Sequence, residues 1–208
     1  MAKDPSLDAA YALNGTDDVR DLYQAWADSY DTGFAAGQGY QLPQLVAQAY
    51  VDAGGAGPVL DVGAGTGLVG QELARHGIGP IDAVDLSADM LRVARCKGIY
   101  RNLIEADINA PLPVDDPYAG IVSAGTFTLG HVGPDGIITL LDWAAPGTLF
   151  VISVNARHYV SAGFAGVMAE LSSELTDQGI HDVPIYDPAR CDPDHRADTA
   201  RLLIFRKG

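Results

Sequence analysis

The feature that most constrains the fold is an apolar stretch that runs directly into a glycine-rich turn at residues 59–67, Val-Leu-Asp-Val-Gly-Ala-Gly-Thr-Gly. The stretch is typical of a buried strand, and the glycines let a ligand approach the backbone closely where a helix begins. By spacing alone, residues 65–70 also satisfy the dinucleotide fingerprint G-x-G-x-x-G. Gly63, Gly65 and Gly67 therefore predict a ligand-binding loop without naming its ligand.

After this turn, short apolar runs alternate with helix-length segments, as in a parallel sheet with crossover helices. Ser87 is the expected N-cap of one helix, and Pro184 indicates an edge strand because proline cannot donate to a central ladder. The segment 187–199 is expected to be a long exposed loop. The predicted helices are 66–76, 88–96, 135–144 and 160–178. The predicted strands are 59–62, 81–85, 103–106, 120–123, 149–153, 183–186 and 202–205.

Helical spacing also precedes the glycine turn and predicts a helix at about 17–29. A turn rich in glycine follows at Gly33, Gly37 and Gly39, and a second helix then carries Val46 and ends at Gly54. A chain of 208 residues is long enough for one sizeable core. We expect a single domain over 1–208, in which about 1–57 form N-terminal cap helices and 58–208 form the core.

The net charge and the cysteine content limit which binding partners and which cellular location we expect. The formal net charge of −14 would repel phosphate backbones, so nucleic acid is an unexpected partner. Cys96 and Cys191 are too few for a disulfide framework, and residues 1–5 do not begin an apolar signal segment. Apolar runs fall short of the ~20 residues that a membrane-spanning helix needs. We therefore expect a cytoplasmic protein with no membrane anchor.

Acidic residues lie at the ends of three successive predicted strands. The carboxylate of Asp61 would attract a ligand ammonium and repel a pyrophosphate in the same turn. Asp85 ends the next strand, from which a carboxylate accepts hydrogen bonds from ribose hydroxyls. Asp107 is placed to receive an adenine amino group. Apolar contacts to the ring faces are expected from Leu86, Met90 and Ile108.

These residues resemble the class I S-adenosylmethionine-dependent methyltransferases, whose glycine motif is D/E-x-G-x-G-x-G with an acidic residue ending the second strand. Residues 23–31, Tyr-Gln-Ala-Trp-Ala-Asp-Ser-Tyr-Asp, also resemble the Y-x-x-W-A-x-x-Y-D segment of the methyltransferase-like group that includes the Williams-Beuren region methyltransferase. The resemblance covers most of the chain. It implies a three-layer α/β, Rossmann-like sheet, mostly parallel with an antiparallel last strand. It also implies S-adenosylmethionine as cofactor, S-adenosylhomocysteine as product, and Tyr23, Trp26 and Tyr30 bordering the methionine end.

The segment 123–131 follows the fourth predicted strand, where related methyltransferases line the transfer site. We expect Ser123 there, and His131 is the one candidate for a base, although the catalytic residue is not determined. Phe127 can be either a pocket wall or a core residue. The N/D-P-P-Y/F tetrapeptide of many amide and adenine N-methyltransferases is absent, which favours a small-molecule acceptor. No histidines have metal-ligand spacing, so no metal site is expected.

Two alternatives stay open at this stage. An NAD-dependent oxidoreductase is favoured by the overlapping glycine fingerprint and opposed by Asp61 and by the two helices before the glycine turn. A noncatalytic module that senses S-adenosylmethionine is the other, because transfer from an activated sulfonium does not demand a strong base. Titration with both cofactors separates the first alternative, and turnover separates the second.

Overall fold

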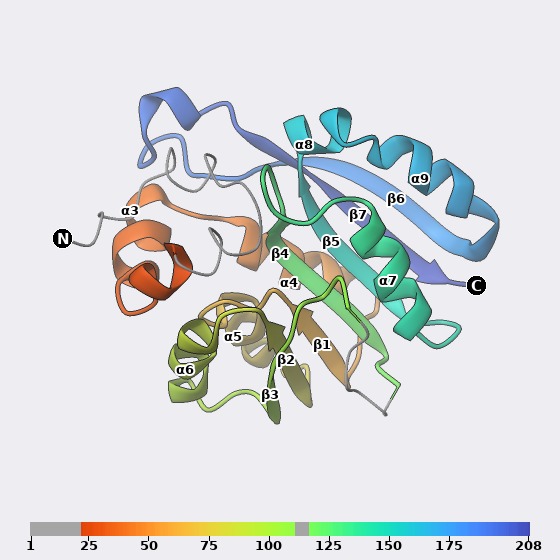
Figure 1. The fold of residues 1–208 in the computed structure, drawn as a ribbon, viewed down its shortest axis with the longest axis horizontal. Helices are drawn as coiled ribbons and strands as arrows, with labels where there is room; N and C mark the ends of the chain where they lie inside the picture. Colours follow the sequence, from red (N-terminus) through yellow and green to blue (C-terminus); the bar gives the residue numbers. More distant parts are fainter. Residues whose placement is uncertain (1–21, 111–116) are drawn as a thin grey trace.

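The computed structural model describes residues 22–110 and 117–208, which form a seven-stranded sheet in the order β3-β2-β1-β4-β5-β7-β6 (Figure 1). Strands β1 to β5 run parallel, whereas β7 is antiparallel to both of its neighbours. The predicted fold class, a mostly parallel α/β sheet with an antiparallel last strand, is thereby confirmed. The strands are β1 Val59–Val62, β2 Ile81–Asp85, β3 Asn102–Glu105, β4 Gly120–Phe127, β5 Leu149–Asn155, β6 Leu175–Pro184 and β7 Thr199–Lys207.

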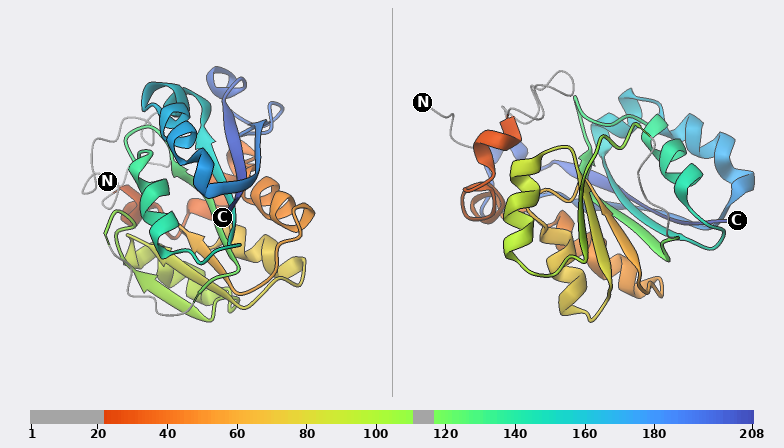
Figure 2. Two further views of the ribbon diagram at one scale, coloured as in Figure 1. Left: turned by 90° about the vertical axis from the view of Figure 1, so that its right-hand side faces the viewer. Right: turned by 60° about the horizontal axis from the view of Figure 1, so that its bottom comes forward.

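Helices cover both faces of the sheet, which gives three layers (Figure 2). Side chains alternate along each strand. Val59 therefore packs with the layer of α4 and α5, whereas Leu60 packs with the layer of α7, α8 and α9. β5 is buried along its whole length because both faces are covered. The helices are α4 Leu42–Asp52, α5 Leu68–Arg75, α6 Ala88–Cys96, α7 Asp135–Trp143, α8 Ala156–Ser161 and α9 Phe164–Glu170.

Local sequence signals explain the helices that were predicted correctly. Ser87 caps α6, since its side chain accepts a hydrogen bond from the backbone N–H of Met90 at 3.3 Å. Gly54 follows α4 with φ +73, a left-handed conformation that suits glycine after a helix. The predicted strand of Pro184 belongs to β6, which lies at the sheet edge as expected.

The N-terminal part differs from the predicted helix and glycine turn. Residues 17–21 lie outside the described part, 22–26 are helical, and a turn separates them from a π-helix, η1, at Tyr30–Ala35. The short helix α3, Ala36–Gln38, follows directly. Gly33 and Gly37 therefore lie inside helical turns, and Gly39 ends them with φ +61. Aromatic packing against the rest of the protein outweighs the low helix propensity of glycine here.

The predicted helix over 160–178 is confirmed only in part, because α8 ends at Ser161 and α9 covers only Phe164–Glu170. Gly163, with φ +78, separates α8 from α9, and a 3₁₀ turn, η2, occupies Leu171–Glu174. The chain then enters β6, whose pairing with β7 begins at Leu175 opposite Lys207. Long-range pairing thus overrides a local helical pattern.

The predicted exposed loop at 187–199 is only partly exposed. It contains the 3₁₀ helix η3, Pro193–His195, and Cys191 and Asp198 are buried. Asp198 accepts a hydrogen bond from Arg157 at 2.9 Å and lies 2.7 Å from Nδ1 of His195. None of the helices within residues 22–110 and 117–208 is both long and apolar enough to cross a membrane.

Candidate active site

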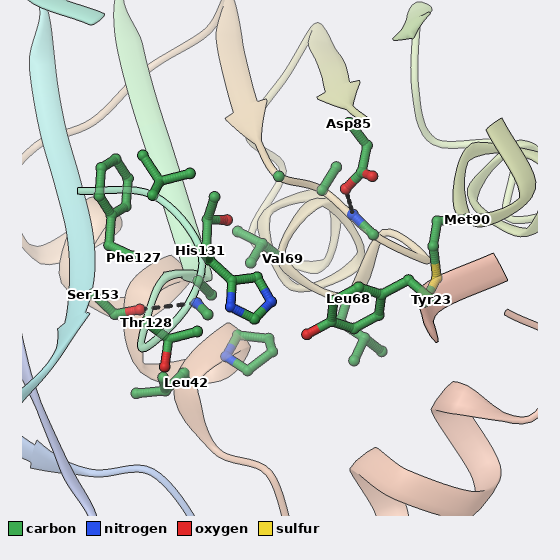
Figure 3. A pocket seen from close by; sticks show the side chains of 18 of the residues that line it. Tyr23, Leu42, Leu68, Val69, Asp85, Met90, Phe127, Thr128, His131 and Ser153 are labelled. Atoms are coloured by element: carbon green, nitrogen blue, oxygen red, sulfur yellow. Dashed lines mark hydrogen bonds between the residues drawn. The ribbon is translucent and has the colours of Figure 1, made fainter. Parts of the chain in front are cut away.

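The carboxyl ends of the parallel strands open onto a cavity of about 220 Å³, the usual place for a ligand in such a sheet (Figure 3). Two groups of strands contribute to it. The ends of β1, β2 and β3 supply the glycine turn and carboxylates, whereas the ends of β4 and β5 supply His131, hydroxyl groups and an amide. Residues 22–43 and 185–186 complete the wall with aromatic and aliphatic side chains.

The glycine turn and Asp85 form one hydrogen-bonded unit. The backbone N–H of Gly65 donates to Oδ2 of Asp85 at 2.7 Å, and that of Ser87 donates to Oδ1 at 2.8 Å. Each oxygen keeps a lone pair for a further donor. Burial raises the pKa of the Asp85 carboxyl. Gly65 has φ +55, and none of the described heavy atoms lies within 4 Å of the position that a Cβ would take, so the turn leaves space above it.

Asp61 does not line the cavity, contrary to the expected contact with a ligand ammonium. It is completely buried, and its Oδ2 accepts hydrogen bonds from the Tyr100 hydroxyl at 2.6 Å and the Gly70 N–H at 3.1 Å. Strand alternation directs it into the layer of α5, beneath the turn. Its Oδ1 has no hydrogen-bond partner among the described residues. Burial raises the pKa of this carboxyl to about 7.

Of the three glycines, Gly63 and Gly65 line the cavity and Gly67 does not. A Cβ on Gly67 would lie 2.7 Å from the ring of Tyr100, so this glycine serves the packing of that ring. The segments that follow β2 and β3 bring together the residues expected to contact adenine. Oδ1 of Asp107 accepts hydrogen bonds from the backbone and side-chain nitrogens of Asn109, both at 2.9 Å. The other expected residues that line this part are Leu86, Met90 and Ile108.

The cap aromatics divide between cavity and core. Tyr23 and Tyr30 line the cavity as expected. Trp26 does not, because it is 1% exposed and stacks on Phe34 at a centroid distance of 5.8 Å. Helical spacing had placed all three aromatics on one face, but the chain leaves the helix after residue 26. Phe34, which the sequence did not single out, takes a place in the wall.

Asp31 connects the N-terminal cap helices to the glycine turn. Its Oδ1 accepts a hydrogen bond from the Thr66 hydroxyl, and its Oδ2 lies 2.8 Å from the ammonium of Lys97 after α6. Thr66 is buried and Lys97 is only 16% exposed, so water screens this contact less than an ordinary surface ion pair. The cap therefore closes directly on the ligand-binding turn.

His131 faces into the cavity, next to the ring of Tyr23 at 5.8 Å (Figure 3). Its Nδ1 lies 2.9 Å from the carbonyl oxygen of Leu129. A carbonyl only accepts, so Nδ1 carries the proton and Nε2 of the neutral ring carries a lone pair. Nε2 is buried and has no partner among the described residues. Burial lowers the pKa of His131, which keeps the ring neutral at pH 7.

Ser123 is not at this position, contrary to expectation. It is completely buried and its hydroxyl donates to the carbonyl oxygen of Val62 at 2.8 Å, linking β4 to β1. Ser153, near the end of β5, lines the cavity instead although it is buried, and its Oγ accepts a hydrogen bond from the N–H of Gly125 at 3.1 Å. The rule that ligands lie at the carboxyl ends of strands would have found Ser153. Thr128, in the expected segment 123–131, does line the cavity. Other lining residues missed by sequence reasoning are Tyr40, Leu42, Asn155, Ile185 and Tyr186.

Comparison with known proteins gives this site its context. Residues 59–146 match the family described as a methyltransferase domain. Human methyltransferase-like protein 27 is 30% identical over 142 residues, which are 65% of this chain and 57% of that protein. A ubiquinone biosynthesis O-methyltransferase of Psychrobacter cryohalolentis is 33% identical over 133 residues, 60% of this chain and 51% of the relative. The chain spans about half the length of the curated relatives that it matches.

Solved structures extend the match to nearly the whole fold. Magnesium protoporphyrin IX methyltransferase from Synechocystis, with bound S-adenosylmethionine, covers 99% of this chain and 100% of its own at a TM-score of 0.66 and 16% identity. A TehB-like methyltransferase from Corynebacterium glutamicum covers 90% and 99% at a TM-score of 0.62 and 18% identity. At these identities, the two structures show that the chain shares the fold of S-adenosylmethionine-dependent methyltransferases.

The lining of the cavity fits S-adenosylmethionine chemically. Among the described lining residues, the charged side chains are the carboxylates of Asp85 and Asp107, which suit a cationic sulfonium and its hydroxyls better than a pyrophosphate. The N–H of Gly65 is donated to Asp85, whereas a dinucleotide-binding turn directs such groups to phosphate. These features favour S-adenosylmethionine over NAD as the ligand of this cavity.

Proposed function

We propose that the protein transfers a methyl group from S-adenosylmethionine to an oxygen atom of a small-molecule acceptor, with His131 as the general base. The observation that carries this proposal is the fixed tautomer of His131, whose unpartnered Nε2 lone pair lies in the cavity wall. When bound, the cofactor supplies a methyl group on a positively charged sulfur. The imidazole takes the proton that a hydroxyl acceptor loses as its oxygen is methylated.

The proposed cofactor position follows the first group of strands. We assign the ribose hydroxyls to the Asp85 carboxylate, because its oxygens are already oriented by the Gly65 and Ser87 amides. Asp107 receives the adenine amino group. Tyr23 and Tyr30 border the methionine end, next to the turn of Gly63 and Gly65. The ring faces of the base contact Leu86, Met90 and Ile108.

Oxygen is proposed as the attacked atom for two reasons. A hydroxyl gives up a proton on methylation, and a neutral imidazole in the cavity wall is suited to receive it. Several relatives also carry the name ubiquinone biosynthesis O-methyltransferase, which is carried over here only as support. A cavity mostly enclosed by aromatic and aliphatic side chains favours a small molecule over a protein or nucleic acid.

Turnover with a panel of hydroxylated metabolites tests this function, with S-adenosylhomocysteine formation as the readout. His131→Asn should lower kcat by about 10²- to 10⁴-fold, the usual contribution of a general base. The affinity for S-adenosylhomocysteine, measured by calorimetry, should stay unchanged. His181→Asn, at an exposed position of β6, is the matched control and should keep full activity.

The pH profile adds a second readout. Because burial lowers the pKa of His131, kcat/KM should stay high down to pH values below the usual histidine pKa and fall only under more acidic conditions. Binding of S-adenosylhomocysteine without any turnover would favour the noncatalytic sensing module instead. Full activity of His131→Asn would show that His131 is not the general base.

Three broader statements accompany this function. We propose that the chain is one domain and belongs to the methyltransferase-like group that includes the Williams-Beuren region methyltransferase. Supporting the group, residues of the Y-x-x-W-A-x-x-Y-D segment have separate structural roles, since Trp26 packs in the cap core and Asp31 bonds the glycine turn. A cytoplasmic location is proposed because Cys96 and Cys191 are both free.

A further inference from the structure

We propose that the methyl acceptor is an uncharged phenol that binds at the ends of β4 and β5. This inference rests on the proposed function and names the substrate class of the same site. In the step, the phenol oxygen forms a bond to the methyl carbon as the methyl–sulfur bond breaks, and the phenolic proton passes to Nε2 of His131. The products are an aryl methyl ether and S-adenosylhomocysteine, and the protonated imidazole then returns its proton to water.

The shape of this half of the cavity favours a flat ring. Phe34, Tyr40 and Tyr186 form a continuous aromatic wall, with centroid distances of 6.4 Å, 5.9 Å and 6.5 Å between the three pairs. The Tyr40 hydroxyl lies against the backbone of Gly125 after β4, since a Cβ on Gly125 would lie 2.4 Å from that hydroxyl. Flat π-faces pack best against another aromatic ring. The aliphatic side chains that complete this wall are Leu42, Pro43 and Ile185.

The charges of the lining exclude an ionic acceptor. The described residues that line the cavity at the ends of β4 and β5 include no lysine, arginine, aspartate or glutamate. The two lining carboxylates, Asp85 and Asp107, follow β2 and β3, on the far side of the glycine turn. A carboxylate, phosphate or ammonium buried here would lack a counter-charge, which is costly. Polar orientation comes from the neutral side chains of Thr128, Ser153 and Asn155.

The strength of the base selects among neutral hydroxyl compounds. Burial lowers the pKa of His131, so its imidazole is a weaker base than an exposed histidine. A phenol, with a pKa of about 10 as in tyrosine, lies within a few units of it. An aliphatic hydroxyl, with a pKa of about 16 like bulk water, lies much further away. Proton transfer to His131 is therefore practical for a phenol and poor for an alcohol.

Four probes of matched size test the inference with saturating S-adenosylmethionine. They are para-cresol, its isomer benzyl alcohol, para-toluidine as the amine, and para-hydroxybenzoate as the charged phenol. Product formation is followed by mass spectrometry, and binding to the protein loaded with S-adenosylhomocysteine by calorimetry. We expect para-cresol to be methylated on oxygen at least about 100-fold faster than benzyl alcohol or para-toluidine. We expect para-hydroxybenzoate to bind at least about 10-fold more weakly than para-cresol.

Variants of Tyr40 test the aromatic wall separately. Tyr40→Leu should raise the KM for para-cresol about 10-fold and leave the affinity for S-adenosylhomocysteine unchanged, whereas Tyr40→Phe should keep the KM within about 2-fold. Because Tyr40→Phe retains the aromatic ring, a higher KM in Tyr40→Leu alone would show that the acceptor packs against this ring.

The outcomes separate this inference from the proposed function. Faster methylation of benzyl alcohol would overturn the phenol and leave oxygen transfer standing. Faster methylation of para-toluidine would overturn both the phenol and the attacked atom. Equal binding of para-hydroxybenzoate would overturn the uncharged acceptor. If the protein binds S-adenosylhomocysteine but methylates none of the probes, the proposal of a phenol acceptor is wrong. The proposed function is then tested by the panel of hydroxylated metabolites.

Discussion

The backbone N–H of Gly65 donates a hydrogen bond to the carboxylate of Asp85 at 2.7 Å, which joins the turn after β1 to the end of β2. The bond orients the carboxylate toward the cavity before any ligand arrives. A preorganised acceptor of this kind loses little conformational entropy on binding. The proposed ribose contact depends on this pair.

Replacing Asp85 tests that contact directly. Asp85→Ala should weaken binding of S-adenosylhomocysteine by about 1.5 to 3 kcal/mol, the range for hydrogen bonds to a charged group. Calorimetric titration measures the change. Asp89→Ala removes a nearby carboxylate on α6 that does not line the cavity, and it should leave the affinity unchanged. Equal losses in both variants would point to general electrostatics instead of a specific contact.

The stability of the protein should depend on pH through Asp61. Burial raises its pKa to about 7 in the folded state, whereas the unfolded carboxyl titrates near its model value of 3.8. The folded state thus binds the proton more tightly, and its stability contribution is lost as pH rises from about 4 to about 7. Asp61→Asn removes this loss. Relative to the native chain, the variant should gain on the order of 4 kcal/mol in unfolding free energy between pH 4 and pH 8.

Urea denaturation at both pH values measures this difference, with Asp82→Asn as the opposite case. Burial alone would raise the pKa of Asp82, but hydrogen bonds from Arg101 and Tyr118 outweigh it, and the pKa is lowered. Its contribution is therefore present above the unfolded pKa and lost as pH falls. Asp82→Asn should be destabilising at pH 8. A pH-independent effect of Asp61→Asn would contradict the assignment to a buried titrating carboxyl.

The contact of Asp31 with Thr66 and Lys97 should control how fast the cofactor leaves. Asp31→Ala frees the cap from the glycine turn, so we expect dissociation of S-adenosylhomocysteine to be about 10-fold faster, the effect of one charge-assisted hydrogen bond. Stopped-flow fluorescence of the cap aromatics follows the release. Asp28→Ala breaks the exposed pair with Arg92 and should change the rate by less than about 2-fold. Similar rates for both variants would show that the cap does not limit release.

Gly67 should tolerate a methyl group less well than another left-handed glycine. Gly67 has φ +89 and Gly77 has φ +74, so alanine is strained at both by about 1 to 2 kcal/mol. A Cβ at 67 would additionally lie 2.7 Å from the Tyr100 ring, whereas none of the described heavy atoms comes within 4 Å at 77. Gly67→Ala should therefore cost about 1 to 3 kcal/mol more than Gly77→Ala in urea denaturation. Equal costs would mean that Tyr100 moves aside freely.

The sequence by itself determined the parts that depend on neighbouring residues. The hydrophobic pattern predicts the strand at 59–62, and the backbone freedom of glycine predicts the turn after it. The short polar side chain of Ser87 predicts the helix cap. All three effects act within a few residues. Asp85 was placed correctly at the cavity because a strand end and a turn fix its position. The edge position of Pro184 followed from its missing N–H.

Only the tertiary structure decided which side chains face the cavity. The sequence places Asp61 and Asp85 alike, near the ends of neighbouring strands. The alternation of side chains along β1 nevertheless directs Asp61 beneath the glycine turn, where the Tyr100 hydroxyl donates a hydrogen bond to it. Tyr40 and Tyr186 come from distant parts of the chain and meet through an isolated antiparallel bridge. Such meetings depend on strand order and register, which arise from long-range pairing and packing, and a local sequence pattern carries no record of them.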